Sequence, residues 1–165
     1  MREMHVAKSA GYAGDSEDRW ANFRVSERFG VQAFTGTLVR MGDKFIRIQN
    51  LVANPANEQV GENLKDTLMD LASYSLIALC ISKENGKKLV AKKGQQGDPA
   101  YMRQLDNMTK TPVSKASWKV SQGCIEEIFN DLAKSHDTRD ERTEFYLFNL
   151  AYWSLIGICA LEKID

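Results

Sequence analysis

Residues 62–81 read ENLKDTLMDLASYSLIALCI, and this run has the composition of one helix with two different halves. Its first half places Glu62, Asp66 and Asp70 four residues apart, so at about 100° per residue the three carboxylates lie on one face. Its second half, Leu71 to Ile81, is apolar on almost every side and must be buried among other helices. The carboxylates therefore lie close to the interior, where they need cations, either lysine and arginine side chains or a metal ion.

Three further segments, residues 31–52, 114–135 and 143–164, have the apolar spacing of helices. A first helix is expected from about Glu17 to Arg28, ended by Gly30. No alternating apolar pattern is long enough to predict a strand. The sequence therefore predicts an all-α bundle of about five helices, in which residues 31–52 and 62–81 are antiparallel neighbours.

The composition indicates one globular domain, because 43% of the 165 residues are hydrophobic and 27% are charged. Within it we distinguish residues 8–82, a lysine- and glycine-rich loop region at 83–113, and a C-terminal helical hairpin at 114–165. Basic and acidic residues both number 22, and this zero net charge argues against nucleic acid as a partner. The two histidines lack the spacing of a zinc site, and no glycine-rich phosphate-binding motif is present.

The location expected from the sequence is the cytoplasm. The three cysteines are far apart and odd in number, which is typical of reduced thiols. No secretory signal is recognisable, and no uninterrupted apolar run reaches the roughly 20 residues of a membrane span. We therefore expect neither a membrane span nor disulfides.

The central helix resembles the last one. Residues 70–80, DLASYSLIALC, align without a gap with residues 149–159, NLAYWSLIGIC. Either a helix was duplicated and then degenerated, or two helices of similar composition solve the same packing problem. In this register Asp66 corresponds to Phe145 and Asp70 to Asn149, so the second helix lacks the acidic stripe. Two helices that are apolar nearly all round exceed what a small monomer readily covers, which predicts a homo-oligomer.

Four motifs follow one another in the first half of the chain: YAGD at 12–15, ANFR at 21–24, VRMGDKFIRIQNL at 39–51 and ENLKDTLMDLASY at 62–74. This succession resembles the phage and prophage family called the nucleotide modification associated domain. It is more distantly similar to the all-α nucleoside triphosphate pyrophosphohydrolases of the MazG and dUTPase type. The resemblance covers roughly residues 8–82, and its most specific piece runs from Asp66 to Tyr74.

The resemblance implies a helical bundle, usually oligomeric, in which carboxylates of two adjacent helices hold Mg²⁺ and a nucleotide pyrophosphate binds across it. The implied metal ligands are Asp43, Glu62, Asp66 and Asp70, and of these Asp66 and Asp70 are the implied catalytic residues. The implied nucleotide contacts are Tyr12, Asn22, Phe23, Arg24, Arg40, Lys44, Arg47 and Tyr74.

These residue types suit a magnesium-dependent reaction. Mg²⁺ takes hard oxygen ligands, neutralises phosphate charge and can activate a water for attack at an α-phosphorus. Arg40, Lys44 and Arg47 could stabilise the charge on the phosphates. The resemblance therefore implies a Mg²⁺-dependent enzyme of phage or prophage nucleotide metabolism, in the host cytoplasm, that converts a nucleoside triphosphate to its monophosphate and pyrophosphate.

Three alternatives stay open on the sequence. The pyrophosphohydrolases carry Glu-x-x-Glu on their first metal helix, whereas residues 31–52 offer only Asp43, which favours a protein that binds a nucleotide or nucleotide-derived signal without turnover, or a scaffold. The acidic stripe could also be a salt-bridge network with Lys44, Arg47 and Lys65. Phe23 could simply belong to the buried side of the first helix.

Overall fold

The computed structural model describes residues 18, 20–56, 63–84, 103–104, 106–107, 117–135 and 141–162. This part of the chain contains four long α-helices and one short 3₁₀ helix: η1 (Arg24–Phe29), α2 (Ala33–Ala53), α3 (Leu64–Ser82), α5 (Trp118–Ser135) and α6 (Glu141–Leu161). No strand occurs among these residues. The prediction of an all-α bundle of about five helices is confirmed.

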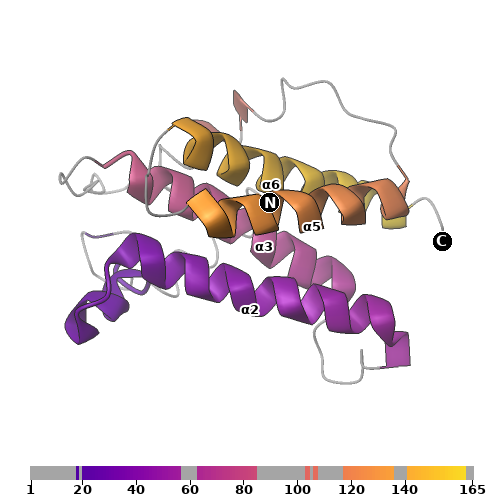
Figure 1. Cartoon of the computed structure of the whole chain (residues 1–165), viewed down its shortest axis with the longest axis horizontal. Coiled ribbons are helices and arrows are strands. Elements are labelled where there is room, and N and C mark those ends of the chain that lie inside the picture. The colour runs from indigo at the N-terminus through magenta and orange to yellow at the C-terminus, as the bar shows by residue number, and fades with distance from the viewer. Residues whose placement is uncertain are drawn as a thin grey trace, which may run out of the picture.

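The four long helices run side by side along the long axis of the molecule (Figure 1). Helix α3 packs against α2 and α6, and α6 packs against α5. The bundle closes where α5 meets α2, since the rings of Phe45 and Phe129 stack with their centroids 4.1 Å apart. The predicted pairing of the second and third helices is therefore present, and α5 and α6 follow one another in the chain and pack together.

Helix α3 is the central element of the bundle. Its start is set by Asn63, whose side-chain oxygen accepts a hydrogen bond from the Asp66 backbone N–H at 2.8 Å, while the Asp66 carboxylate accepts one from the Asn63 N–H at 3.5 Å. This reciprocal capping satisfies two amides that have no partner within the helix. From Thr67 onward nearly every residue is buried, and this agrees with the expectation for the half that starts at Leu71.

Helices α3 and α6 pack with equivalent residues. In the alignment of residues 70–80 with 149–159, Ser75 corresponds to Ser154, and both hydroxyls donate a 2.7 Å hydrogen bond to the carbonyl four residues earlier, that of Leu71 or Leu150. Four fully buried positions also correspond: Leu68 with Leu147, Leu71 with Leu150, Ala72 with Ala151 and Ser75 with Ser154. Others differ, since Cys80 is buried and Cys159 is exposed. The resemblance between the two helices therefore reflects a shared mode of burial as well as a shared composition.

The first helix was predicted wrongly. The chain between Trp20 and Phe23 forms a turn, and helical structure covers only Arg24–Phe29 as a single 3₁₀ segment. This segment buries none of its residues, so no apolar face stabilises a longer α-helix. Gly30 ends it as expected, in the left-handed conformation with φ 75°. Glu17 lies outside the described residues, as does most of the loop region predicted at 83–113.

Helix α6 is long and apolar enough to cross a membrane by those two criteria, and it is the one such helix in the described part of the chain. Helix α6 contains no long uninterrupted apolar run, but it is apolar on average despite residues such as Asn149 and Ser154. Within its most apolar window 44% is buried inside the bundle. A single helix of this kind also occurs in the core of many proteins, and it does not identify a membrane span.

The matched leucines provide a test of this packing. Leu71→Ala and Leu150→Ala each remove a side chain with no exposed surface. We expect each to lower the free energy of unfolding by about 2–5 kcal/mol, because a cavity remains in the core. Urea unfolding followed by circular dichroism measures the loss. The control Phe145→Ala removes a ring that is 61% exposed and should cost about 0.5 kcal/mol or less. Equal costs for all three would contradict the arrangement.

Candidate functional site

The candidate site lies where α2 faces α3. Near the middle of both helices, Lys44 Nζ lies 3.0 Å from the Asp70 carboxylate, with the two side chains only 19% and 11% exposed. Ion pairs this far from solvent are weakly screened, and each charge depends strongly on its partner. Asp70 is therefore held by a cation, which is what the sequence required of a carboxylate on this face.

A second group of contacts lies next to the Lys44–Asp70 pair, toward the C-terminal end of α3. The Arg40 guanidinium donates a 2.9 Å hydrogen bond to the Asn22 carbonyl and lies over the Phe23 ring, 4.9 Å from its centroid. The Phe23 ring meets Tyr74 edge to face, with 5.5 Å between centroids. We call the residues Asn22, Phe23, Arg40, Lys44, Asp70 and Tyr74 the α2–α3 seam.

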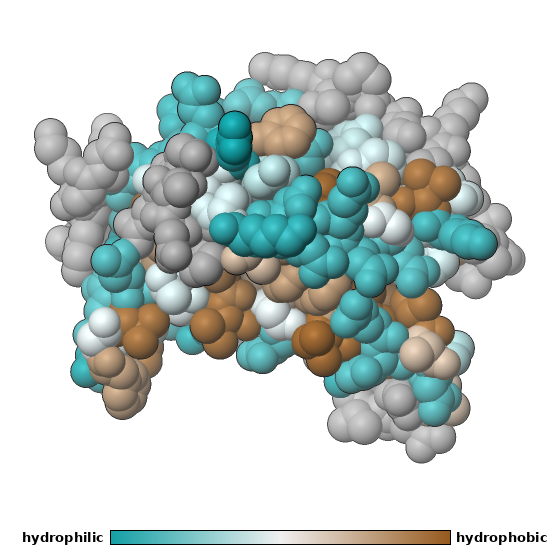
Figure 2. All heavy atoms as spheres, in the orientation of Figure 1, coloured by the Kyte–Doolittle hydropathy of each residue, from teal (hydrophilic) through white to brown (hydrophobic). Residues whose placement is uncertain are grey.

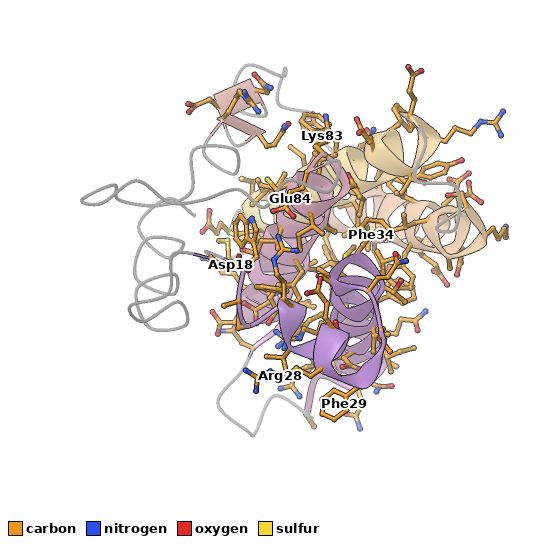
Figure 3. The ribbon with its side chains drawn as sticks, turned by 90° about the vertical axis from the view of Figure 1, so that its left-hand side faces the viewer. Asp18, Arg28, Phe29, Phe34, Lys83 and Glu84 are labelled. Atoms are coloured by element: carbon orange, nitrogen blue, oxygen red, sulfur yellow. The ribbon has the colours of Figure 1, made fainter. Side chains whose placement is uncertain are left out.

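Arg24 lies next to the seam and is surrounded by carboxylates. Its guanidinium donates a hydrogen bond to Glu84 and forms ion pairs with Asp18 at 2.8 Å and Glu27 at 3.6 Å. Burial lowers the pKa of the Arg24 guanidinium, but the hydrogen bond with Glu84 and the charges of Glu84, Asp18 and Glu27 raise it, and the pKa lies above its ordinary value. Asp18 and Glu84 both lie at this end of the molecule (Figure 3). The cluster ties the chain before η1 to the end of α3.

Asp18 and Glu84 were missed by the sequence analysis. Glu84 follows the last turn of α3, in a lysine-rich stretch that predicts a solvated loop, yet it is 9% exposed. Arg24 and Glu84 are 60 positions apart in the sequence, so no helical or strand period predicts their contact. Only the fold brings these charges together.

The remaining predicted residues are distributed around the seam. Asp43 and Asp66 are exposed, and Asp66 belongs to the cap of α3. Arg47 is half-buried, at a position that shares a face of α2 with Arg40 and Lys44. Tyr12 and Glu62 lie outside the described residues. The fold therefore brings six of the predicted residues into two groups of direct contacts, the Lys44–Asp70 pair and the group around Phe23, and places Arg24 beside them.

A pre-formed metal cage is absent from the described residues, since they contain no group of three His, Cys, Asp or Glu side chains that could hold one ion. Asp70 is the one predicted metal ligand among them that is nearly buried, and Lys44 is paired with it. Mg²⁺ commonly binds through one or two carboxylates and completes its shell with waters and substrate phosphates. A magnesium ion here would have Asp70 as its one nearly buried carboxylate and would need oxygens from water or a substrate for the rest of its shell.

Comparison of the chain with known proteins found no match to a family model, to a curated protein or to a solved structure.

Helix η1 approaches α2 closely next to the seam. A Cβ added at Gly36 would lie 2.4 Å from Ser26 Oγ and 2.7 Å from Ser26 Cβ. We expect Gly36→Ala to displace the segment that carries Phe23 and to lower the free energy of unfolding by about 1–3 kcal/mol. Thermal unfolding measures the stability, and tryptophan fluorescence, to which Trp20 at 2% exposure contributes together with Trp118 and Trp153, reports on the packing.

A compensating change and a matched control make this test specific. Ser26→Gly removes both clashing atoms and should restore the stability of the Gly36→Ala protein. Gly123→Ala, in α5, adds a Cβ with no atom within 4 Å and should leave the stability unchanged or raise it by about 1 kcal/mol. A Gly36→Ala protein as stable as the Gly123→Ala protein would refute the close contact.

Proposed function

We propose that the chain binds a nucleoside phosphate together with Mg²⁺ at the α2–α3 seam. The observation that carries the proposal is the nearly buried pair of Lys44 and Asp70. A magnesium–phosphate ligand is itself a pair of opposite charges. It needs a carboxylate for its cation and an ammonium for its anion, and the seam holds both groups side by side.

When the ligand replaces the Lys44–Asp70 contact, every charge still has a partner of opposite sign. In the protein alone, Lys44 and Asp70 neutralise each other, which limits the cost of removing both from water. With a magnesium–phosphate ligand present, Asp70 faces a cation and Lys44 faces an anion, so neither side chain is left uncompensated. A ligand with phosphate but no divalent cation would satisfy Lys44 and leave Asp70 opposed to a negative charge. The pair therefore favours binding that requires the metal.

The neighbouring cations of α2 support a polyphosphate as the anion. Arg40, Lys44 and Arg47 are spaced four and three residues apart and share one face of the helix. Guanidinium groups match phosphate oxygens with two parallel hydrogen bonds, which a single lysine does not provide.

The aromatic side chains of the seam support a nucleoside as the remainder of the ligand. Tyr74 is half-buried and offers a ring face and a hydroxyl. The Phe23 ring is only 6% exposed and contacts the Tyr74 ring edge to face. Phe23 therefore packs against Tyr74 without being accessible to a ligand itself.

Hydrolysis is the second candidate function. Asp66 lies one helical turn before Asp70 on the same face of α3 and is exposed, where a second carboxylate could meet a ligand. Against turnover stands the single exposed carboxylate of α2, Asp43. Binding is the primary proposal, and the release of pyrophosphate decides between an enzyme and a binding protein.

Titration calorimetry with a panel of ribo- and deoxyribonucleoside triphosphates tests the proposal. We expect the wild type to bind at least one member of the panel with Mg²⁺ and to lose that binding when EDTA is added. Asp70→Asn should weaken it by about 30-fold, as expected for the loss of one charge-assisted contact of about 2 kcal/mol. Pyrophosphate release is measured in the same samples.

The controls separate the site from the stability of the fold. Asp131→Asn changes an acid on α5 that pairs with Lys134 at 3.2 Å, and it should bind like the wild type. Asp66→Asn alters an exposed cap and should weaken binding while changing stability by less than about 1 kcal/mol. Unchanged affinity in a folded Asp70→Asn protein, or no binding across the whole panel, would refute the proposal.

A further inference from the structure

Two ion pairs link α3 and α6 at opposite ends of these helices. Lys65, in the first turn of α3, pairs with Glu162, which directly follows α6, at 2.5 Å. Lys83, which directly follows α3, pairs with Glu144, in the first turn of α6, at 2.9 Å. In the alignment of the two helices, each lysine corresponds to the glutamate of the other pair: Lys65 to Glu144 and Lys83 to Glu162. Exchanging the two helices therefore turns each ion pair into the other, with the signs of the charges reversed.

This reciprocity is what a two-fold axis produces. A half-turn that places α3 on α6 also places α6 on α3, so every contact between the two helices is exchanged for its counterpart. The same half-turn must place the other neighbour of α3 on the other neighbour of α6. These neighbours are α2 and α5. The axis therefore relates the α2–α3 hairpin to the α5–α6 hairpin.

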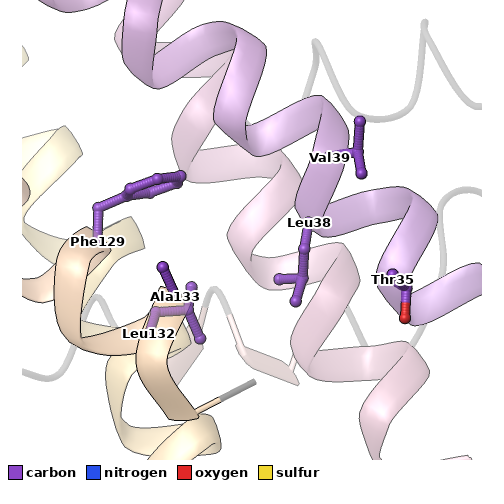
Figure 4. Close-up of a pocket in the computed structure, with 6 residues that line it drawn as sticks. All are labelled: Thr35, Leu38, Val39, Phe129, Leu132 and Ala133. Carbon is purple, nitrogen blue, oxygen red and sulfur yellow. The ribbon is translucent and has the colours of Figure 1, made fainter. Parts of the chain in front are cut away.

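The contact between α2 and α5 gives the register of this second match. Counterparts touch each other where the axis passes, and there Phe45 and Phe129 stack with 4.1 Å between centroids. The Phe129 ring lies at the edge of a hollow of about 230 Å³ between the two helices and points toward α2 (Figure 4). If Phe45 and Phe129 are counterparts, the second hairpin needs a shorter connection than the first. The chain between α5 and α6 is shorter than the chain between α2 and α3, as required.

The interiors of α2 and α5 agree in this register. Each helix has one buried hydroxyl residue, Thr37 in α2 and Ser121 in α5, and the two fall on each other when Phe45 is placed on Phe129. Both hydroxyls donate to the carbonyl four residues earlier, at 2.8 Å and 3.3 Å. Two further pairs of buried residues coincide: Met41 with Ile125 and Ile48 with Leu132. Since Phe45 and Phe129 are the one identical pair of the two helices, sequence comparison does not detect this likeness.

The outer surfaces of the two hairpins differ. Val39 and Ile46 of α2 are 61% and 54% exposed, and their counterparts on α5 are Gly123 and Asn130. In Figure 2 hydrophobic side chains lie at intervals over α2, whereas those over α5 are mostly hydrophilic. Most surface positions contribute little to stability, so two copies of one unit can diverge there while the interior is kept.

The half-turn also assigns a counterpart to the Lys44–Asp70 pair. Ile128 takes the place of Lys44, and Asn149 takes that of Asp70. Ile128 packs against the hydrophobic core, and the Asn149 amide donates a 2.8 Å hydrogen bond to the Phe145 carbonyl of its own helix. The position of the ion pair in the first hairpin therefore holds two uncharged side chains in the second.

We propose that the chain consists of two copies of one helical hairpin, α2–α3 and α5–α6, related by an approximate two-fold axis, and that Ile128 and Asn149 occupy a second seam that has lost its charges. Each hairpin covers the apolar helix of the other, as two subunits would. This relation holds whether or not the α2–α3 seam binds a ligand. Where the proposed function holds as well, the chain binds one ligand, because of the two seams the α2–α3 seam is the charged one.

Restoring the missing charges tests the second seam. Ile128→Lys, Asn149→Asp and the combined variant are unfolded in urea without ligand and followed by circular dichroism. Ile128→Lys alone should lower the stability, because an ammonium replaces a side chain that packs on the core. We expect the two changes to couple favourably by about tenfold in the unfolding equilibrium constant, since the new carboxylate would lie against the new lysine as Asp70 lies against Lys44.

A matched control separates this pairing from a general effect of charge. Asn130→Asp adds a carboxylate on the opposite side of α5 from position 128, and it should not couple with Ile128→Lys. No coupling between Ile128→Lys and Asn149→Asp, or an equal coupling with Asn130→Asp, would overturn the equivalence of the two seams.

An exchange of side-chain size provides a second test, at a position far from both seams. A Cβ added at Gly157 of α6 would lie 3.0 Å from the Trp118 ring of α5. Their counterparts in the first hairpin are Ala78 and Phe34, so a smaller ring there corresponds to a residue that has a Cβ. The two-fold axis therefore predicts that Phe34 lies against Ala78, and that a larger ring at position 34 requires glycine at position 78.

Urea unfolding measures this exchange as well. We expect Phe34→Trp to unfold at a lower urea concentration than the wild type, because the core is overpacked. Adding Ala78→Gly should recover part of the loss, although glycine within a helix is itself unfavourable. The control adds Ala72→Gly, at another fully buried position of α3, and should increase the loss. A Phe34→Trp protein that gains no more from Ala78→Gly than from Ala72→Gly would contradict the two-fold relation.

Discussion

The ion pair between Lys44 and Asp70 is the interaction on which the rest of the candidate site depends. Asp70 lies on the most buried helix of the bundle, and a carboxylate there is tolerated because α2 brings an ammonium to within 3.0 Å of it. The pair links the middle of α2 to α3. Beside it Arg40 lies over the Phe23 ring, and Phe23 contacts Tyr74.

Much of the fold was predictable because apolar spacing dominates the long helices. The helices expected at 31–52, 62–81, 114–135 and 143–164 are present, with ends that differ by a few residues where caps such as Asn63 decide the boundary. The prediction of the first helix was wrong because the buried apolar residues Trp20 and Phe23 lie in a turn and do not form one face of a helix. Exposure was less predictable, since spacing alone does not show that α5 leaves Val39 and Ile46 of α2 uncovered.

The candidate site was predictable where it follows a single helix. The face shared by Arg40, Lys44 and Arg47 and the one shared by Asp66 and Asp70 follow from the helical period. What the sequence could not show is which carboxylates enter the interior. Asp70 does and receives Lys44, whereas Asp66 stays exposed and caps α3. The salt bridge that the sequence left as an alternative and the proposed ligand site therefore involve the same two side chains, Lys44 and Asp70.

A double-mutant cycle on Lys44 and Asp70 tests whether their two charges hold α2 against α3. Lys44→Met, Asp70→Asn and the combined variant are unfolded in urea without ligand, and the coupling free energy is obtained from the three changes in stability. A weakly screened, nearly buried pair predicts a coupling of about 1–3 kcal/mol. A coupling indistinguishable from zero would mean that the two charges do not hold α2 against α3, and it would contradict the account of the seam.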